Sequence, residues 1–426
     1  MSSVISLRSR TTFWTPAPKG SEFLDQFAFT PVSQPIFSPS HQRLVGYEAL
    51  IRVQRQQQAV PPPQLFEAAQ RADCTDQLDR HLLQLHLDSF AHQQPPVPVW
   101  LFLNISPTTC VHPDNCLTTL TEHCRHLGIE PAQVVLEVVE TEVAERQALL
   151  DFVAQAKARG FQIAIDDFGV GDSNFERMWQ LEPLIVKLDR SLLVNAECHP
   201  RARQLLDSLV RMIRESGSLV LLEGIETDAQ ARIALATDAD LLQGFYFGRP
   251  APLADNEAAP LQQRFQRLLA NNQQFASVDH LAQEGFLRLL RFETLEACHR
   301  IMRQEAFDQA CGGLLTIAGV KRCFLLDRQG VQQGNLAIAS PDHQRRTFNP
   351  LYGSSGACWA HREYVRLAIE QPQQVNACRP YVALPDATRT ITLSTTLQLG
   401  DQAMIFCVDL HPDELFNGQL SFPPTL

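Results

Sequence analysis

The sequence is short of positive charge. It has 36 lysines and arginines against 47 aspartates and glutamates, a net charge of -11 over 426 residues, and only four of the basic residues are lysines: Lys19, Lys157, Lys187 and Lys321. This balance gives no general attraction to nucleic acid or to an anionic membrane surface, so we expect neither DNA nor a membrane as a partner. An anionic ligand must therefore be bound locally, by a few cations placed at one site.

Other features are missing as well. None of the 11 cysteines falls in a CxxC pair, so reduced thiols are favoured over a disulfide framework or a zinc site. The N-terminus has no apolar core long enough for a signal peptide, and no segment approaches the roughly 20 apolar residues of a membrane helix. We therefore expect a cytoplasmic protein.

The pattern of apolar residues divides the chain. Residues 1–25 are expected to be a flexible tail. From 26 to 254, near-continuous apolar strands alternate with helical patterns, which is typical of a parallel sheet covered by helices. Two strands form an initial hairpin and six follow, which favours an α/β fold of the (β/α)8 TIM-barrel type over an open nucleotide-binding sheet. Residues 255–310 are expected to be a helical linker, and 311–426 a smaller α+β domain.

Nearly every expected barrel strand ends in an ionisable or amide side chain. The C-terminal ends of barrel strands meet on one face, so we expect these side chains to share a pocket. Taken singly, each has an ordinary structural explanation, such as a solvated rim position or an amide that satisfies buried backbone groups. Their occurrence at seven strand ends favours a common site. In chain order the residues are Glu48, Asn104, Glu137, Asp166 with Asp167, Lys187, Glu223 and Gln243.

The five carboxylates of this set predict a metal site. They cannot all stay ionised in one pocket unless positive charge lies among them, and Lys187 supplies only one charge. An all-oxygen ligand set selects hard ions, so we expect two Mg²⁺ or Mn²⁺ ions, with Ca²⁺ as an inhibitory substitute. On a regular strand the side chains of Asp166 and Asp167 would point to opposite faces of the sheet. Where a strand turns into a loop, both side chains can point into the pocket. Two such ions are typical of phosphate-ester cleavage.

These residues lie in motifs that resemble the EAL family of cyclic-di-GMP phosphodiesterases. The segment "GYEALIR" contains the letters that name the family, and the chain carries further motifs in the family's order: "SQPIF", "LNIS", "LEVVE", "IDDFGVGDS", "VKLD", "LEGIET" and "LQGFYFGRP". The resemblance covers roughly residues 26–252. It implies a barrel whose first strand runs antiparallel to the others, and hydrolysis of cyclic-di-GMP to linear pGpG.

The resemblance also implies roles for individual residues. Glu48, Asn104, Glu137 and Asp166 would hold one metal ion, and Asp166, Asp167 and Glu223 the other. Lys187 would orient the attacking water, with Gln243 beside it and Glu140 bracing the loop after the two aspartates. The residues expected to contact the substrate, directly or through a neighbour, are Gln34, Leu50, Arg52, Asn104, Asp167 and Glu226.

The loop after the aspartates departs from the family pattern. Val139 and Val170 stand where the family usually has threonine, and Asn174 follows Ser173 where it usually has a second serine, so hydrogen bonds that set the loop are lost. Three functions remain open: an active phosphodiesterase, a catalytically silent cyclic-di-GMP receptor that acts through a protein partner, and a two-metal phosphoesterase with another substrate. The first is favoured because every expected metal ligand and the lysine are present.

The C-terminal region faintly resembles PAS/Cache-type sensor domains, through "CWAHREYVRLAIEQ" and "RPYVALPDATRTITLSTTL". That resemblance implies a small-molecule or protein signal that regulates the barrel, and the alternative is an inert dimerisation module. The helices between the domains are apolar on one face, which suits packing on the barrel or on a second subunit. We expect a homodimer.

Overall fold

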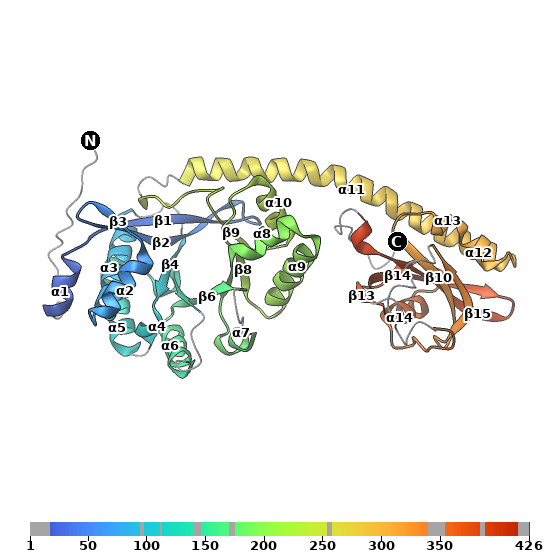
Figure 1. The fold of residues 1–426 in the computed structure, drawn as a ribbon, viewed down its shortest axis with the longest axis horizontal. Helices are drawn as coiled ribbons and strands as arrows, with labels where there is room; N and C mark the ends of the chain where they lie inside the picture. The colour runs from blue at the N-terminus through green and yellow to red at the C-terminus, as the bar shows by residue number, and fades with distance from the viewer. Residues whose placement is uncertain are drawn as a thin grey trace. The chain divides into compact units, whose positions relative to one another are not determined.

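The computed structural model describes residues 18–93, 98–110, 113–139, 146–169, 175–253, 258–339, 354–383, 388–415 and residue 426. The chain divides into two compact units, Met1–Asn272 and Gln273–Leu426 (Figure 1). No helix among the described residues is long and apolar enough to cross a membrane.

Eight strands of the first unit form a closed barrel. They are β1 (Ala28–Ser38), β2 (Arg43–Arg55), β4 (Trp100–Ile105), β5 (Val134–Val138), β6 (Gln162–Phe168), β7 (Ile185–Leu188), β8 (Leu219–Leu222) and β9 (Leu241–Gln243). β1 pairs with both β2 and β9, which closes the sheet, and it runs antiparallel to both neighbours. All other neighbours in the ring are parallel. The prediction of a TIM-type barrel with an antiparallel first strand is confirmed.

Helices cover the outside of this barrel (Figure 1). They are α2 (Pro62–Arg71), α3 (Thr75–Gln93), α4 (Pro107–Cys110), α5 (Pro113–Leu127), α6 (Arg146–Ala158), α7 (Phe175–Leu181), α8 (Arg190–Cys198), α9 (Pro200–Glu215) and α10 (Asp228–Ala236). Side chains that alternate outward from the strands, such as Leu136 and Val186, pack against the apolar faces of these helices, for example at Phe152. This outer layer fixes the strands, and the strands in turn fix the residues at their ends.

β2 is longer than the barrel requires. Its parallel pairing with β4 stops at Glu48, but the strand continues to Arg55 and pairs there with β1 and with the short strand β3 (Gln58–Val60). Glu48 therefore lies at the end of the barrel segment of β2 and not at the end of the strand. The hairpin extension accounts for the difference, because antiparallel pairing continues where the parallel ladder has ended.

The expected N-terminal tail differs from the structure at its last residues, while residues 1–17 lie outside the described part of the chain. Helix α1 (Pro18–Leu24) lies within the segment 1–25 that we expected to be a flexible tail. Phe23 and Leu24 are buried in a cluster with Leu65 and Leu78, so burial of apolar surface orders this turn of the chain.

The second unit contains an antiparallel sheet between helices. Its strands are β10 (Val320–Asp327), β11 (Gln332–Ile338), β12 (Asn376–Ala377), β13 (Tyr381–Val382), β14 (Arg389–Leu399) and β15 (Gln402–Leu410), in the order β11-β10-β15-β14-β12 with β13 beside β14. β10 pairs with β11 and β14 pairs with β15, each as an antiparallel hairpin. The unit is α+β, as predicted.

Helices cover both faces of this sheet. One face packs against the C-terminal part of α11 (Ala258–Met302), through residues such as Leu290 and Ala297, and against α12 (Phe307–Ala310) and α13 (Gly312–Leu315). The other face packs against α14 (Glu363–Glu370), through Tyr364 and Val365. The N-terminal part of α11 belongs to the first unit, where Phe265 and Leu268 join the barrel's core. The helical segment expected over 255–310 is largely the single 45-residue helix α11.

Candidate active site at the C-terminal ends of the barrel strands

The barrel interior decides which side chains reach the site. Its middle is filled by seven apolar side chains: Ile36, Phe102, Val135, Ala164, Ile185, Leu221 and Leu241. Side chains alternate along a strand, so the residue two further along each parallel strand also points inward. These residues are Asn104, Glu137, Asp166, Lys187, Glu223 and Gln243. On β1, which runs the other way, the equivalent residue is Gln34, opposite Glu48 of β2. A polar layer thus caps the apolar one.

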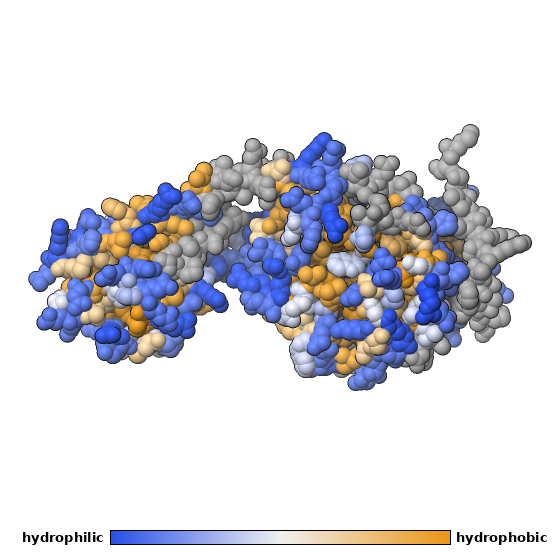
Figure 2. All heavy atoms as spheres, turned by 180° about the vertical axis from the view of Figure 1, so that it is seen from behind, coloured by the Kyte–Doolittle hydropathy of each residue, from blue (hydrophilic) through white to orange (hydrophobic). Residues whose placement is uncertain are grey.

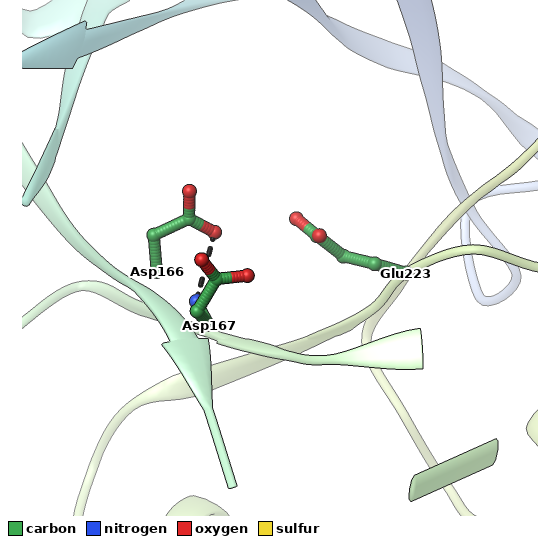
Figure 3. A group of neighbouring side chains, drawn as sticks. All are labelled: Asp166, Asp167 and Glu223. Atoms are coloured by element: carbon green, nitrogen blue, oxygen red, sulfur yellow. Dashed lines mark hydrogen bonds between the residues drawn. The ribbon is translucent and has the colours of Figure 1, made fainter. Parts of the chain in front are cut away.

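Asp166 and Asp167 reach the same space because the strand is irregular between them. The register of β6 against β7 shifts between Ile165 and Phe168, and Asp167 has a φ of 54°, in the left-handed region. The Asp167 N–H donates to Asp166 Oδ1 at 3.0 Å (Figure 3). We expected the pair at a strand end, and the structure instead has it at a bulge inside β6. The consequence is the same, since both carboxylates lie on the side of Glu223.

Lys187 lies at the centre of the carboxylates. Its Nζ is 2.6 Å from Glu137 Oε1, 2.7 Å from Glu223 Oε1, 2.9 Å from Asp166 Oδ1 and 3.6 Å from Glu48 Oε1. The side chains of Lys187 and Glu137 are 1% and 0% exposed, so their charges are almost fully removed from water. Four strands that are far apart in the sequence thus meet at one ammonium group.

The electrostatics of the cluster reflect a shortage of positive charge. Burial raises the pKa of Glu137 well above its usual value, and Lys187 offsets only part of this effect. Burial likewise raises the pKa of Glu223 to about 8, and burial together with the Asp166 charge raises that of Asp167. Burial by itself would lower the pKa of Lys187, but the surrounding carboxylates raise it well above its usual value. The ammonium therefore stays charged, while the carboxylates compete for protons or cations.

These residues fit hard divalent cations. Ligand atoms of Asp166, Asp167 and Glu223 all lie within 4.8 Å of one another, and among the described residues this is the acidic group with the geometry to hold a metal ion (Figure 3). Glu137 Oε2 is buried and has no hydrogen-bond partner in the described part of the chain. When all five carboxylates are ionised, they and one ammonium leave four negative charges unbalanced, which is the charge of two divalent cations. All these donors are oxygens, as hard cations require.

Amide side chains hold Glu48 at the edge of the cluster. Gln243 Nε2 donates to Glu48 Oε2 and, at 3.2 Å, to Gln34 Oε1. Asn104 Nδ2 donates to Glu48 Oε1 at 3.4 Å, and Gln34 Nε2 donates to the Gly248 carbonyl at 3.1 Å. Gln243 Oε1 is buried and has no hydrogen-bond partner among the residues that the structure describes, so it can accept a hydrogen bond from a bound group.

A cavity of about 580 Å³ opens beside this cluster. Asn104 belongs to both, and the cavity is also lined by Leu50 and Arg52 and by Phe245 and Arg249 after β9. The Arg52 guanidinium donates to the Pro250 carbonyl at 2.7 Å, and the Arg249 guanidinium lies over the Phe245 ring at 4.4 Å. Two guanidiniums and a 40% exposed aromatic ring suit a ligand that carries both phosphate and a flat base.

One of the remaining expected site residues lies elsewhere, and another falls outside the residues that the structure describes. Glu226 accepts both hydrogen bonds of the Arg190 guanidinium, at 2.7 and 2.8 Å, outside the carboxylate cluster. Glu140 lies outside the described residues, as do Val170, Ser173 and Asn174. The structure therefore brings together the expected metal ligands with Lys187, Gln243 and Gln34, and it brings Leu50 and Arg52 to the adjoining cavity.

Sequence reasoning missed most residues that line the cavity, among them Phe245, Arg249 and His86. Phe245 and Arg249 belong to the segment "GFYFGRP", and their position directly after a barrel strand was the signal that could have found them. His86 gave no such signal, because it lies within the amphipathic helix α3. Burial lowers the pKa of His86 to about 4, so a neutral imidazole lines the cavity.

Comparison with protein families gives a match to one family model. The model, described as EAL domain, matches residues 21–250. Two curated relatives, the probable cyclic di-GMP phosphodiesterase PdeN of Escherichia coli and the cyclic di-GMP phosphodiesterase RocR of Pseudomonas aeruginosa, are each 27% identical. The matches cover 52% of this chain and 43% of PdeN, and 54% of this chain and 59% of RocR. The match also covers 27% of an uncharacterised signalling protein of Caulobacter vibrioides and 64% of the cyclic di-GMP phosphodiesterase PdeL of Escherichia coli, so the chain spans less than two thirds of the length of these relatives.

A solved structure is similar over nearly the whole chain. It is the EAL-domain protein YkuI of Bacillus subtilis in complex with cyclic-di-GMP and calcium, with a TM-score of 0.70 and 21% sequence identity. The match covers 91% of this chain and 96% of YkuI. The barrel and the smaller α+β unit therefore occur together in another protein with the same fold.

Proposed function

Because the chain belongs to the EAL domain family, we propose that it hydrolyses one phosphodiester bond of cyclic-di-GMP and releases linear pGpG. The observation that carries the proposal is the buried Lys187 ammonium in contact with carboxylates from four strands, next to a cavity lined by two arginines. Such a site has the charge for metal ions and the room for a dinucleotide.

Glu48, Asn104, Glu137 and Asp166 would hold one divalent cation, and Asp166, Asp167 and Glu223 the second. The oxygen ligands suit Mg²⁺ or Mn²⁺, and we propose that Ca²⁺ binds without supporting turnover. When bound, two such ions lower the pKa of a water and stabilise negative charge on the phosphoryl oxygens.

The protein's own groups would position the reacting atoms. The three N–H donors of Lys187 point at Glu137, Glu223 and Asp166 in the structure, and one of them would turn to orient the attacking water once a cation takes over a carboxylate. Gln243 fixes the Glu48 carboxylate and keeps its own buried Oε1 available to accept a hydrogen bond. Glu140 would brace the loop that follows β6.

The substrate would be held by the cavity beside the metal ligands. Arg52 and Arg249 can each present a planar guanidinium to phosphate oxygens. Phe245 offers an exposed ring on which a guanine can stack, and Leu50 contributes an apolar wall. Gln34 lies behind Gln243 and would place the substrate through that amide.

The experiment is to incubate the purified chain with cyclic-di-GMP and Mg²⁺ or Mn²⁺, and to follow pGpG by chromatography. Glu48→Gln keeps the shape of the side chain and removes its charge, and Glu215→Gln on the exposed end of α9 is the matched control. We expect product from the wild type and from the control, and none from Glu48→Gln. Nucleotide binding without product would support the silent receptor instead. The absence of both binding and product would contradict the proposal.

Three further statements belong to the same proposal. The α+β unit senses a small-molecule or protein signal that regulates turnover. The protein acts in the cytoplasm, which agrees with 11 cysteines that are all reduced thiols in the structure. The active form is a homodimer.

A further inference from the structure

A cavity of about 410 Å³ opens at the end of the barrel opposite to the carboxylate cluster. Residues at or just before the N-terminal ends of β4, β5, β8 and β9 line this bottom cavity, together with the turn between β1 and β2. The polar layer with the expected metal ligands lies at the C-terminal ends of these strands, and the layer of seven apolar side chains fills the barrel between the two ends. The bottom cavity is therefore separate from the proposed active site.

Half-buried apolar side chains form the inner wall of the bottom cavity. Val45, Trp100 and Leu219 pack against the apolar layer of the barrel interior and also line the cavity. The ring of Phe102, which belongs to that layer, meets the Trp100 ring edge-on, at 87° and with 6.5 Å between the ring centres. The indole is thus held in one orientation, and part of its surface stays open to the cavity. An aromatic ring in this state can stack against a flat ligand.

Exposed apolar surface by itself identifies no site in this protein. Figure 2 shows apolar side chains between hydrophilic ones over one face of the molecule, and such surface is ordinary. A concave apolar wall with a few polar groups around it, by contrast, is the usual form of a small-molecule site. The polar groups of the bottom cavity therefore decide which ligand it can bind.

The turn between β1 and β2 supplies hydrogen-bond donors to this cavity. Ser38 Oγ accepts the His41 N–H at 3.4 Å and lies 3.0 Å from His41 Nδ1, so its own hydroxyl proton can point at that ring nitrogen. His41 Nε2 then carries the ring proton and can donate it. Arg43 also lines the cavity, and no hydrogen bond or ion pair joins its guanidinium to another residue in the described part of the chain. Two such donors on one wall suit an anionic group such as phosphate.

A helix fixes this turn from outside the barrel. Gln262, in the part of α11 that belongs to the first unit, donates from Nε2 to the Gln42 carbonyl and accepts the Leu44 N–H with Oε1 at 3.1 Å. The backbone that carries His41 and Arg43 is therefore tied on both sides of Gln42. A wall that is already ordered loses less conformational entropy when a ligand binds.

A carboxylate lies on another side of the same cavity, at the start of β9. Asp240 Oδ2 accepts the Val220 N–H at 2.9 Å, and Asp240 Oδ1 lies 3.4 Å from Arg214 Nε. A carboxylate can accept about four hydrogen bonds, so Asp240 can still accept from N–H groups of a ligand. In the order of strands around the barrel, the turn between β1 and β2 lies between β9 with Asp240 and β4 with Trp100.

We propose that the bottom cavity binds a purine mononucleotide. The base stacks on Trp100, the phosphate accepts hydrogen bonds from Arg43 and His41, and N–H groups of the base donate to Asp240. The cavity volume lies within the range of about 300–1,000 Å³ that is typical of small-molecule sites. An inorganic anion would leave the apolar wall uncovered, and an uncharged ring would not use Arg43. This site goes beyond the proposed hydrolysis and does not depend on it.

The test is equilibrium dialysis of the full chain against radiolabelled GMP in EDTA, so that no metal ion holds the nucleotide at the carboxylate cluster. We expect saturable binding of one GMP per chain. Arg43→Ala should raise the dissociation constant at least about tenfold because a contact to phosphate is lost, and Trp100→Leu at least about fivefold because stacking is lost. Guanosine, which lacks the phosphate, should compete at least about tenfold less well than unlabelled GMP.

Two controls locate the bound nucleotide. Arg52→Ala alters the cavity beside the carboxylate cluster, so it should leave the GMP dissociation constant unchanged. Arg43 is exposed, so Arg43→Ala should fold, and an unchanged midpoint of thermal unfolding checks this. The absence of saturable binding up to millimolar GMP would overturn the proposal, as would undiminished binding to both Arg43→Ala and Trp100→Leu. Binding that is lost in Arg52→Ala but kept in Arg43→Ala would place GMP in the other cavity and would overturn it as well.

Discussion

Lys187 Nζ lies 2.6 Å from Glu137 Oε1, with both side chains buried in the barrel. A buried ion pair of this kind contributes little net stability when intact, but removal of one partner leaves an uncompensated charge. Here one ammonium serves several carboxylates, so its removal has the larger effect. This asymmetry underlies the first two predictions.

Lys187→Met should destabilise the metal-free protein by about 3–5 kcal/mol, because the buried carboxylates lose the cation that they share. Urea unfolding in the presence of a chelator measures this loss. Adding Glu137→Gln to Lys187→Met should recover part of the stability, since one of the stranded charges is then removed. A double variant that is less stable than Lys187→Met would contradict the electrostatic explanation.

Divalent cations should stabilise the protein. Addition of Mn²⁺ or Mg²⁺ at about a hundred times its dissociation constant should contribute about 2.7 kcal/mol per independent site. The readout is the midpoint of thermal unfolding with and without metal, so it needs no enzymatic activity. Asp167→Asn should reduce the shift, and Glu215→Gln, at an exposed position on α9, should not. An equal shift in both variants would argue against binding at the carboxylate cluster.

The stability of the metal-free protein should fall as the pH rises. The pKa of Glu223 is about 8 in the folded chain against an ordinary value of 4.5, and those of Glu137 and Asp167 are also raised. The folded state therefore binds more protons than the unfolded state, so the stability that Glu223 contributes is complete below about pH 4.5 and is lost as the pH passes about 8. Unfolding midpoints in chelator across this range measure it. The prediction fails if the unfolding midpoint in chelator does not change with pH. It also fails if the midpoint falls equally steeply with pH in saturating Mg²⁺.

Arg52→Ala should weaken substrate binding about tenfold or more, because a charge-assisted hydrogen bond contributes roughly 1.5–3 kcal/mol. We expect the loss mainly in KM, with Arg52→Lys between the alanine variant and the wild type, since lysine keeps the charge but not the two-pronged geometry. Arg71→Ala, on the exposed end of α2, is the matched control. A change in kcat alone would place Arg52 in the chemical step and not in substrate binding.

Thiol labelling should distinguish two cysteines from the other nine. Cys198 and Cys358 are exposed, whereas burial raises the pKa of Cys124, Cys298 and Cys378 to about 12. The thiolate is the reactive form, so at mildly alkaline pH the native protein should react rapidly at two thiols. Release of the coloured product from an aromatic disulfide reagent counts them, with the urea-unfolded chain as the reference for all 11.

The barrel could be predicted because its sequence pattern is local. Near-continuous apolar strands alternate with helices, and the polar residues Asn104, Glu137 and Lys187 each stand two positions beyond an interior apolar residue of the same strand. The order of the barrel's parallel strands follows that of the chain, so knowledge of the fold is enough to bring these residues to one face. The helix α1 was missed because its order comes from contacts with Leu65 and Leu78, which are distant in sequence.

What the sequence determined by itself, then, is the identity and spacing of the charged groups: which strands carry carboxylates, and where the rare lysine lies. Only the tertiary structure decided that Lys187 reaches four carboxylates at once, that a bulge at Asp167 turns two adjacent aspartates the same way, and that Phe245 and Arg249 share a cavity with Arg52. The physical reason is that distances between side chains on different strands depend on register, closure and backbone irregularity, which arise from the packing of the whole barrel and not from any one segment.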